Sequence, residues 1–316
     1  MANLIDGKIS DAPIAKVSRS GEFLRPDSSF RGEILPSQAK ADRYHLYVSL
    51  ACPWAHRTLI LRNLKELRNI IEVSVSNPYM GDKGWTFFND KDPKYLAVLY
   101  VATEKKYTGK ITVPVLWDKE NKVILNNESS EIIRIFNHAF NQLTGNELDF
   151  YPEKLRPEID TINEKVYNSI NNGVYKCGFA GSQSAYEKNV KSLFSAIDEM
   201  EVILSMQPFL VGDKITEADI RLFTTLIRFD AVYYSHFKCN LRLIRDYKHL
   251  YNYMKAIYQL PQVKETCNFE HIKRHYYESH AWINPTKIVP LGPDLEDLET
   301  PHDRGDIEFH RKIITH

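Results

Sequence analysis

The chain has 316 residues, of which 43% are apolar and 26% charged, enough for about two globular domains at the usual ~100 to 200 residues each. Its 41 Lys and Arg residues balance 41 Asp and Glu residues, so no net field favours nucleic acid or an anionic membrane as a partner. The first residues, MANLIDGKIS, lack the order of a signal peptide, and no apolar run approaches the ~20 residues that span a bilayer. A cytoplasmic protein is therefore expected.

The first structured region is predicted after an irregular, polar extension over residues 1–40. Apolar residues alternate from Tyr44 to Leu50, which is typical of a strand. Helical spacing follows Pro53, and alternation returns over residues 71–75. This order predicts a βαβ unit with a parallel strand pair.

The same domain continues after a polar insertion over residues 79–110. VPVLWD and KVILNN read as two strands joined by a tight turn at residues 119–121, and ESSEIIRIFNHAF reads as the closing helix. The order β-α-β, insertion, β-β-α is that of a thioredoxin-like α/β domain, expected over residues 41–140.

The second half of the chain is predicted to be all helical over residues 155–280, with breaks at 178–182, 207–208 and 260–261. The tail, 281–316, is rich in Pro and Asp and is expected to pack on the surface of the helical domain.

One helix start is specified with unusual detail. In ITEADIRLF, Thr216 is placed as the cap and Asp219 as the residue that reaches back to the cap N–H, while Ile215 can pack on Ile220. This capping box predicts stability and carries no chemistry.

Cys52 is the candidate nucleophile. The chain has four separated cysteines and no CxxC, which excludes a zinc-ribbon spacing and a disulfide framework. Pro53 fits the first helical position, so Cys52 lies where a strand ends and free helix N–H groups point outward. Such a setting lowers a thiol pKa from ~8.5 to ~3.5 to 7.5. A structural, buried cysteine is the alternative, but the strand before and the helix after favour a reactive thiolate.

The position of a resolving cysteine is occupied by Ala55. A mixed disulfide on Cys52 therefore has no neighbouring thiol to break it within the motif, and an external thiol must do so. Glutathione is the abundant candidate.

Two further stretches suit a tripeptide ligand. Pro114 stands at a strand entry, where a thioredoxin-like domain typically has a cis proline, and the backbone of Val113 is then open to an extended peptide. Glu128 and Ser129 begin a helix, where a hydroxyl and free N–H groups can hold a carboxylate. Each feature alone is most often structural.

These segments together resemble a known family. CPWAHRTLI, VPVLWD, NESSEII and ITEADIRLF resemble a glutathione transferase with a catalytic cysteine, similar to the omega class. Further stretches resemble its relatives of the xi class, the glutathionyl-hydroquinone reductases: GEFLRPDSSFR, NNGVYKCGFA, LIRFDAVYYSHFKCN, IKRHYYESHAWINPTKIVPLGP and PHDR. They run from residue 21 to 304. The implied fold is that of glutathione transferases, a thioredoxin-like domain followed by an all-α domain.

The resemblance implies a two-step reaction. The Cys52 thiolate takes the glutathionyl sulfur and releases the hydroquinone, and a second glutathione frees the enzyme as glutathione disulfide. The implied glutathione contacts are Trp85, Val113, Pro114, Glu128 and Ser129, and the implied catalytic tyrosines around the quinone are Tyr175, Tyr233 and Tyr276. Glutathione is then a co-substrate, the other partners are quinone-derived small molecules, and the protein is expected to be a homodimer.

Other readings remain. Cys267, His271 and His275 fall at i, i+4 and i+8, but no fourth ligand follows at matching spacing, so no metal is predicted. No GxGxxG or GxxxxGK[ST] occurs, so no tightly bound nucleotide cofactor is predicted. An omega-like thiol transferase or dehydroascorbate reductase would use the same Cys52. A non-enzymatic glutathione-binding scaffold needs no acidified thiol, and Cys52 argues against it.

Overall fold

The computed structural model describes residues 2–10 and 17–311. These residues form two compact units, each built from segments that are not contiguous in sequence. The first unit takes residues 2–10, Arg25–Asn146 and Thr266–Val289. The second takes Val17–Leu24, Glu147–Glu265 and residues 290–311. The chain therefore passes from one unit to the other several times.

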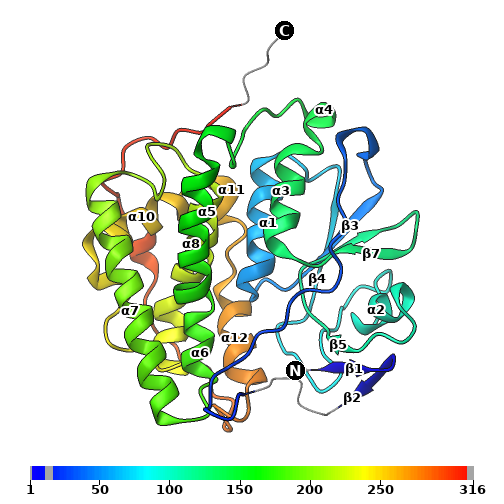
Figure 1. Ribbon diagram of the computed structural model, residues 1–316, viewed down its shortest axis with the longest axis horizontal. Helices are drawn as coiled ribbons and strands as arrows, with labels where there is room; N and C mark the ends of the chain where they lie inside the picture. Colours follow the sequence, from blue (N-terminus) through cyan, green and yellow to red (C-terminus); the bar gives the residue numbers. More distant parts are fainter. Residues whose placement is uncertain (1, 11–16, 312–316) are drawn as a thin grey trace. The chain divides into compact units, whose positions relative to one another are not determined.

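A four-stranded sheet is the centre of the first unit (Figure 1), in the order β4-β3-β6-β7. Its strands are β3 (Tyr44–Val48), β4 (Glu72–Val75), β6 (Val115–Asp118) and β7 (Val123–Asn126). Strand β3 is parallel to β4 and antiparallel to β6, and Leu46 pairs with both Val73 and Leu116. All four predicted strands are confirmed. Strand β7 alternates partly exposed and buried residues, whereas β3 and β6 are mostly buried.

Two helices complete the βαβ and ββα order of this unit. Helix α1 (Pro53–Leu64) begins at Pro53, and α3 (Ser129–His138) follows β7 directly. The two helices contact each other (Figure 1). Buried side chains on α1 include Leu59 and Ile60, and those on α3 include Ile132 and Phe136. Both helices were predicted from this apolar spacing. The short helix α4 (Asn141–Thr144) ends this part of the chain.

Two regions that the sequence left irregular contain regular structure. The extension forms strands β1 (Asn3–Ile5) and β2 (Lys8–Ser10) and a 3₁₀ turn, η1 (Pro36–Gln38). The insertion forms helix α2 (Ala97–Thr103) and strand β5 (Gly109–Lys110), and β5 pairs with β1. Each element is too short for a periodic apolar pattern to identify it.

The second unit is helical, as the sequence predicts (Figure 1). Its elements are η2 (Glu153–Leu155), α5 (Arg156–Lys165), the π-helical turn η3 (Val166–Asn171), α6 (Gly173–Gly178), α7 (Gln183–Met206), α8 (Glu217–Arg228), the π-helical turn η4 (Phe229–Tyr233), α9 (Tyr234–His236), η5 (Ile244–Asp246), α10 (Lys248–Tyr258), α11 (Pro261–Lys264) and η6 (Glu296–Glu299). The three predicted breaks are confirmed: Ser182 caps α7, Gln207 ends it, and Leu260 precedes α11. No helix among the described residues is both long and apolar enough to cross a membrane.

The capping box at the start of α8 is confirmed. Thr216 is the cap, and its N–H donates to Asp219 Oδ2 at 2.7 Å. Asp219 Oδ1 also accepts from the Leu210 N–H and the Tyr253 hydroxyl, each at 2.9 Å. One buried carboxylate therefore joins the start of α8 to α10 and to the loop before α8.

Helix α12 (Phe269–Ser279) lies in the first unit, whereas the sequence placed residues up to 280 in the helical domain. Two hydrogen bonds join it to the chain after β4. The Pro78 carbonyl lies 3.0 Å from His275 Nδ1, and the Met80 N–H donates to Ser279 Oγ at 3.0 Å. An all-helical pattern does not reveal which unit a helix packs against.

The tail is divided in the same way. Residues 281–289 lie in the first unit, and residues 290–311 lie in the second. Within the second unit, Arg304 donates to the Leu204 carbonyl at 2.7 Å and to the His249 carbonyl at 2.8 Å, and Lys255 Nζ donates to Thr300 Oγ1 at 2.7 Å. The expected packing of the tail on the helical unit thus applies to its second part.

Candidate active site

Cys52 lies between strand β3 and helix α1. It is the N-cap residue of α1, with extended backbone (φ −76°, ψ 120°), and Pro53 is the first helical residue. Its thiol donates a hydrogen bond to the Val113 carbonyl oxygen at 3.5 Å. The side chain is partly exposed, whereas Cys177 and Cys239 are buried. Cys52 therefore combines a helix N-terminus with access from solvent, the setting in which thiols react.

The Val113–Pro114 peptide bond is cis, as expected for this strand entry. Both residues are buried, and β6 begins at Val115. The Val113 carbonyl accepts a hydrogen bond from the Cys52 thiol, so the residues before β6 and the start of α1 lie together at the Cys52 sulfur.

Glu128 is the N-cap of α3 and is tightly held. Its Oε1 accepts from the Ser130 N–H at 3.0 Å and the Ser130 hydroxyl at 2.9 Å, and its Oε2 accepts from the Ser28 hydroxyl at 2.9 Å. Burial alone would raise the pKa of Glu128, but these hydrogen bonds and the charge of Arg57 together lower it. Glu128 is therefore a carboxylate at neutral pH.

Ser129 is the first residue of α3 and is buried. Its hydroxyl accepts from Arg57 Nη1 at 3.4 Å. Of the N–H groups in the first turn, that of Ser130 donates to Glu128 Oε1 and that of Glu131 to the Glu128 carbonyl. Ser129 and Glu128 thus place a hydroxyl, the Ser129 N–H and a carboxylate at one helix start.

Two cationic side chains lie over Trp54, two residues after Cys52 in sequence. The Arg57 and Arg25 guanidinium groups are 4.5 and 4.8 Å from the centre of its ring. Burial, and then the charge of Arg25, lowers the pKa of Lys110 to about 8. Three cationic side chains of the first unit are thus linked through Trp54 and Arg25.

Trp85 and Tyr276 are linked through His275. The Trp85 ring stacks on the His275 ring with centroids 4.9 Å apart and an interplanar angle of 27°. Tyr276 is buried and packs edge-on against His275 at 5.2 Å and His280 at 5.6 Å. Helix α12 therefore brings one predicted tyrosine into the same unit as Cys52, Trp85 and Glu128.

Tyr175 and Tyr233 lie together in the second unit. Their ring centroids are 6.1 Å apart, and Tyr233 also stacks on Phe237 at 5.5 Å with an interplanar angle of 15°. Tyr233 is fully buried and Tyr175 is partly exposed. Helix α6 and the π-helical turn η4, which are distant in sequence, thus bring two predicted tyrosines into one aromatic cluster.

Family profiles match both halves of the chain. The profile described as "Glutathione S-transferase, N-terminal domain" matches residues 51–139, and the profile "Glutathione S-transferase, C-terminal domain" matches residues 183–256. A glutathionyl-hydroquinone reductase of Escherichia coli is 48% identical and covers 98% of this chain and 100% of its own. The crystal structure of the glutathione S-transferase Xi from Phanerochaete chrysosporium is 51% identical, with a TM-score of 0.87 over 91% of this chain and 97% of that one. This chain belongs to the xi class of the glutathione transferase family.

A second solved structure, of a relative of this xi-class transferase, contains glutathione. The structure described as the glutathione-bound form of a transferase homologue from Escherichia coli is 46% identical, with a TM-score of 0.86 over 95% of this chain and 98% of that one. The predicted fold, a thioredoxin-like domain with an all-α domain, is thereby confirmed.

Several residues of the candidate site were not predicted from the sequence. Ser28 comes from the extension read as irregular, and Lys110 from the insertion; neither has a periodic signal. Arg57 has a recognisable sequence signal, because it is a charged residue within the apolar run of a helix. It is only 1% exposed. Cys267 lies with its sulfur 3.8 Å from His56 Nε2, whereas His275 stacks on Trp85. The i, i+4, i+8 pattern therefore does not converge on one point.

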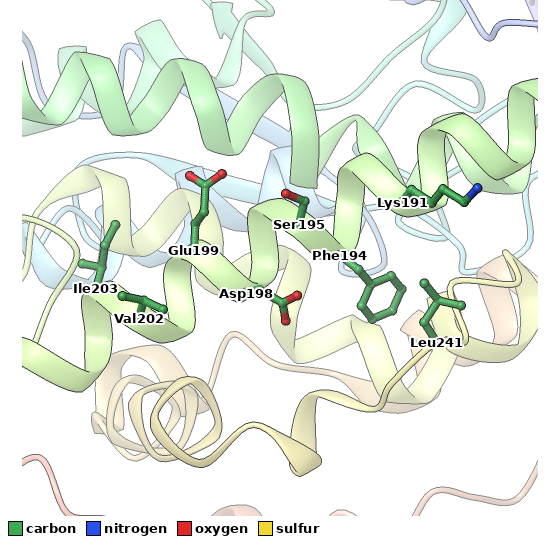
Figure 2. Close-up of a pocket in the computed structure, with 8 residues that line it drawn as sticks. All are labelled: Lys191, Phe194, Ser195, Asp198, Glu199, Val202, Ile203 and Leu241. Carbon is green, nitrogen blue, oxygen red and sulfur yellow. The ribbon is translucent and has the colours of Figure 1, made fainter.

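A separate surface hollow lies along α7 in the second unit (Figure 2). Phe194, Val202 and Leu241 give it an apolar part, and Asp198 and Glu199 add acidic groups. None of the predicted site residues lines it. It is distinct in position and composition from the groups around Cys52.

Proposed function

We propose that this xi-class transferase is a glutathione-dependent reductase that removes glutathione from glutathionyl-hydroquinones. The observation that carries the proposal is the partly exposed Cys52 thiol at the N-terminus of α1, with Ala55 where a dithiol enzyme has its second cysteine. The relative named as a glutathionyl-hydroquinone reductase, aligned over the whole of this chain, supports the choice of substrate.

The reaction has two displacement steps at sulfur. In the first, the Cys52 thiolate attacks the glutathionyl sulfur, a Cys52–glutathione disulfide forms, and the bond between sulfur and the ring carbon breaks. Its electron pair stays on the ring carbon, which takes a proton and becomes hydroquinone. In the second, a glutathione thiolate attacks the glutathionyl sulfur of the mixed disulfide. Glutathione disulfide leaves, and the Cys52 thiolate is restored.

The glutathione would be held by groups of the first unit. The Glu128 carboxylate suits the ammonium group of the γ-glutamyl end, and the hydroxyl and backbone N–H of Ser129 suit its carboxylate. The backbone of Val113 beside Pro114 suits the peptide part, next to the Cys52 sulfur. Trp85, stacked on His275, offers an indole edge to the ligand.

The tyrosines would serve the quinone ring. The hydroxyls of Tyr175, Tyr233 and Tyr276 are assigned to hydrogen-bond the quinone oxygens and to supply the proton to the ring carbon. Reduction of a simple disulfide needs no carbon protonation. The three tyrosines therefore favour the hydroquinone reductase over an omega-like thiol transferase.

Tyr→Phe variants at these three positions test the assignment. Loss of a proton donor should reduce turnover of a glutathionyl-hydroquinone by ~10²- to 10⁴-fold, and loss of an orienting hydroxyl by less. Turnover of hydroxyethyl disulfide should change little. The measurement is the ratio of the two rates for each variant. Equal losses on both substrates would contradict the role and favour the thiol transferase.

A substrate comparison tests the activity itself. Glutathionyl-menadione or another glutathionyl-hydroquinone should be turned over far faster than hydroxyethyl disulfide or dehydroascorbate, with one glutathione disulfide formed per hydroquinone. A preference for dehydroascorbate would replace the proposal by the omega-like reductase, and glutathione binding without any turnover would indicate a scaffold.

We further propose that the protein acts as a homodimer in the cytoplasm, with glutathione as co-substrate and no tightly bound cofactor. Membership of the xi class and the balance of charged residues support this. Analytical ultracentrifugation of the full chain measures the mass directly, and a monomer at micromolar concentration would contradict the dimer.

A further inference from the structure

Tyr100 is a buried residue of α2, the helix inside the insertion. Its side chain is fully inaccessible to solvent. Its hydroxyl donates to the Thr112 carbonyl at 2.8 Å and accepts from the Thr112 N–H at 3.1 Å. The same oxygen accepts from Asn127 Nδ2 at 3.2 Å. One phenol oxygen thus joins two segments that lie far apart in sequence.

Each segment leads directly to a group proposed to bind glutathione. Thr112 precedes Val113, whose carbonyl accepts the Cys52 thiol at 3.5 Å. Asn127 precedes Glu128, the carboxylate at the start of α3. The other end of the Asn127 amide is also fixed, because its Oδ1 accepts from the Phe30 N–H at 3.0 Å. The Tyr100 hydroxyl therefore sets the spacing between the Val113 backbone and Glu128.

The ring and the hydroxyl of Tyr100 have separable roles. The ring packs against Tyr107 at 5.1 Å and Phe30 at 5.8 Å, and a phenylalanine would keep these contacts. Burial raises the pKa of Tyr100 to about 12, so the hydroxyl remains protonated and able to donate at physiological pH. Removing the hydroxyl alone would leave the N–H of the partly exposed Thr112 and the amide of the buried Asn127 without this acceptor.

We infer that Tyr100 is a positioning residue for glutathione, acting through Val113 on one side and Glu128 on the other. The inference rests on the proposed assignment of those two residues as glutathione contacts. It gives the insertion, through α2, a part in building the site.

Glutathione affinity of the Tyr100→Phe variant tests the inference, measured by calorimetry well below the melting temperature. Binding should weaken about tenfold, from the loss of hydrogen bonds to one buried oxygen. In turnover, KM for glutathione should rise to a similar extent while kcat changes less than about threefold. Tyr44→Phe is the matched control: Tyr44 is buried in the same unit, its hydroxyl is 3.5 Å from the Gln38 carbonyl, and its affinity should be unchanged.

Coupling to Glu128 separates positioning from packing. If Tyr100 acts through Glu128, then Tyr100→Phe should weaken binding less in the Glu128→Gln background than in the wild type. Asn127→Ala removes the same link from its other end and should also weaken binding. Unchanged affinity in Tyr100→Phe, or an equal loss in both backgrounds, would overturn the inference. Because binding is measured directly, a protein that binds glutathione normally but reduces no glutathionyl-hydroquinone would refute only the proposed function.

Discussion

Cys52 and Cys267 are both partly exposed, but Cys52 is the N-cap residue of α1 and its sulfur lies beside the cis Val113–Pro114 bond, with no second cysteine following it in the motif. We therefore predict that incubation with glutathione disulfide adds one glutathione to the protein, at Cys52. Intact-mass measurement and peptide mapping check this. Cys52→Ser should take up no label at this position and should lose the reductase activity, because a serine alkoxide is out of reach at neutral pH. Labelling of Cys177, Cys239 or Cys267 in place of Cys52 would refute the assignment.

The charge of Lys110 predicts a pH dependence of glutathione affinity. With its pKa lowered to about 8, Lys110 is charged at pH 7 and loses its charge as the pH rises through about 8. If this charge attracts the anionic ligand, glutathione affinity should fall between about pH 7 and 9. In Lys110→Arg the guanidinium stays charged over this range, so its affinity should fall less. Parallel curves for the two proteins, measured by calorimetry, would exclude Lys110 from binding.

Single residues also show how far the sequence could lead. Cys52 and Glu128 were found because a cap position has a local signature: a strand before, a helix after, and a proline or serine at the first turn. Ser28 and Lys110 could not be found this way. Ser28 lies beside Glu128, and Lys110 interacts with Arg25. These contacts depend on how the extension and the insertion pack in three dimensions, and the residues adjacent in sequence do not indicate that.

Helices and strands show the same limit on sequence-based prediction as single residues. The strands of the central sheet follow from alternating apolar residues in a βαβ and ββα order, and helices α1, α3 and α7 follow from apolar residues at helical spacing. Helix α2 and strands β1 and β5 do not, since α2 has fewer than two helical turns and β1 and β5 have only three and two residues. Helix α2 nevertheless carries Tyr100, so an element that the sequence pattern did not predict provides the proposed positioning residue for glutathione.

The start of α8 offers a test of stability at this scale. Asp219 is fully buried and accepts from Thr216, Leu210 and Tyr253. Asp219→Asn replaces one acceptor oxygen by an amide N–H₂ that faces donors, and should lower the free energy of unfolding by about 2 to 4 kcal/mol. Urea unfolding measures it. Asp213→Asn, an exposed aspartate in the preceding loop, is the control and should stay within about 0.5 kcal/mol. Equal small effects would show that the box contributes little.

At the scale of the whole molecule, the division into units differs from the division of the sequence. A boundary between residues 140 and 155 is visible in the composition, and the structure places it after Asn146, but the return of residues 266–289 to the first unit is not visible. That return depends on specific partners: Thr266 Oγ1 lies 2.7 Å from His56 Nε2, and His275 stacks on Trp85. Helical periodicity is the same whichever partner a helix has, so this assignment had to come from the structure.

A fragment experiment follows from this exchange. Residues 1–146 alone lack α12 and leave His56 and Trp85 without these partners, so the fragment should be largely unfolded by circular dichroism and should not bind glutathione. A peptide of residues 266–289 added in excess should restore part of both signals by mass action. A fragment that folds and binds unaided would show that α12 is dispensable to the first unit.

The return of residues 266–289 to the first unit also determines when that unit can complete its folding during synthesis. Ribosomes release a chain from its N-terminus, and domains generally fold as their residues emerge. Here the sheet with Cys52 is made early, but its last structural segment ends at Val289. Helices α5 to α11, although later in the sequence than the sheet, emerge before α12 does. The nascent first unit must therefore wait, with His56 lacking its Thr266 contact and Trp85 lacking its His275 contact, until nearly all of the polypeptide has been translated.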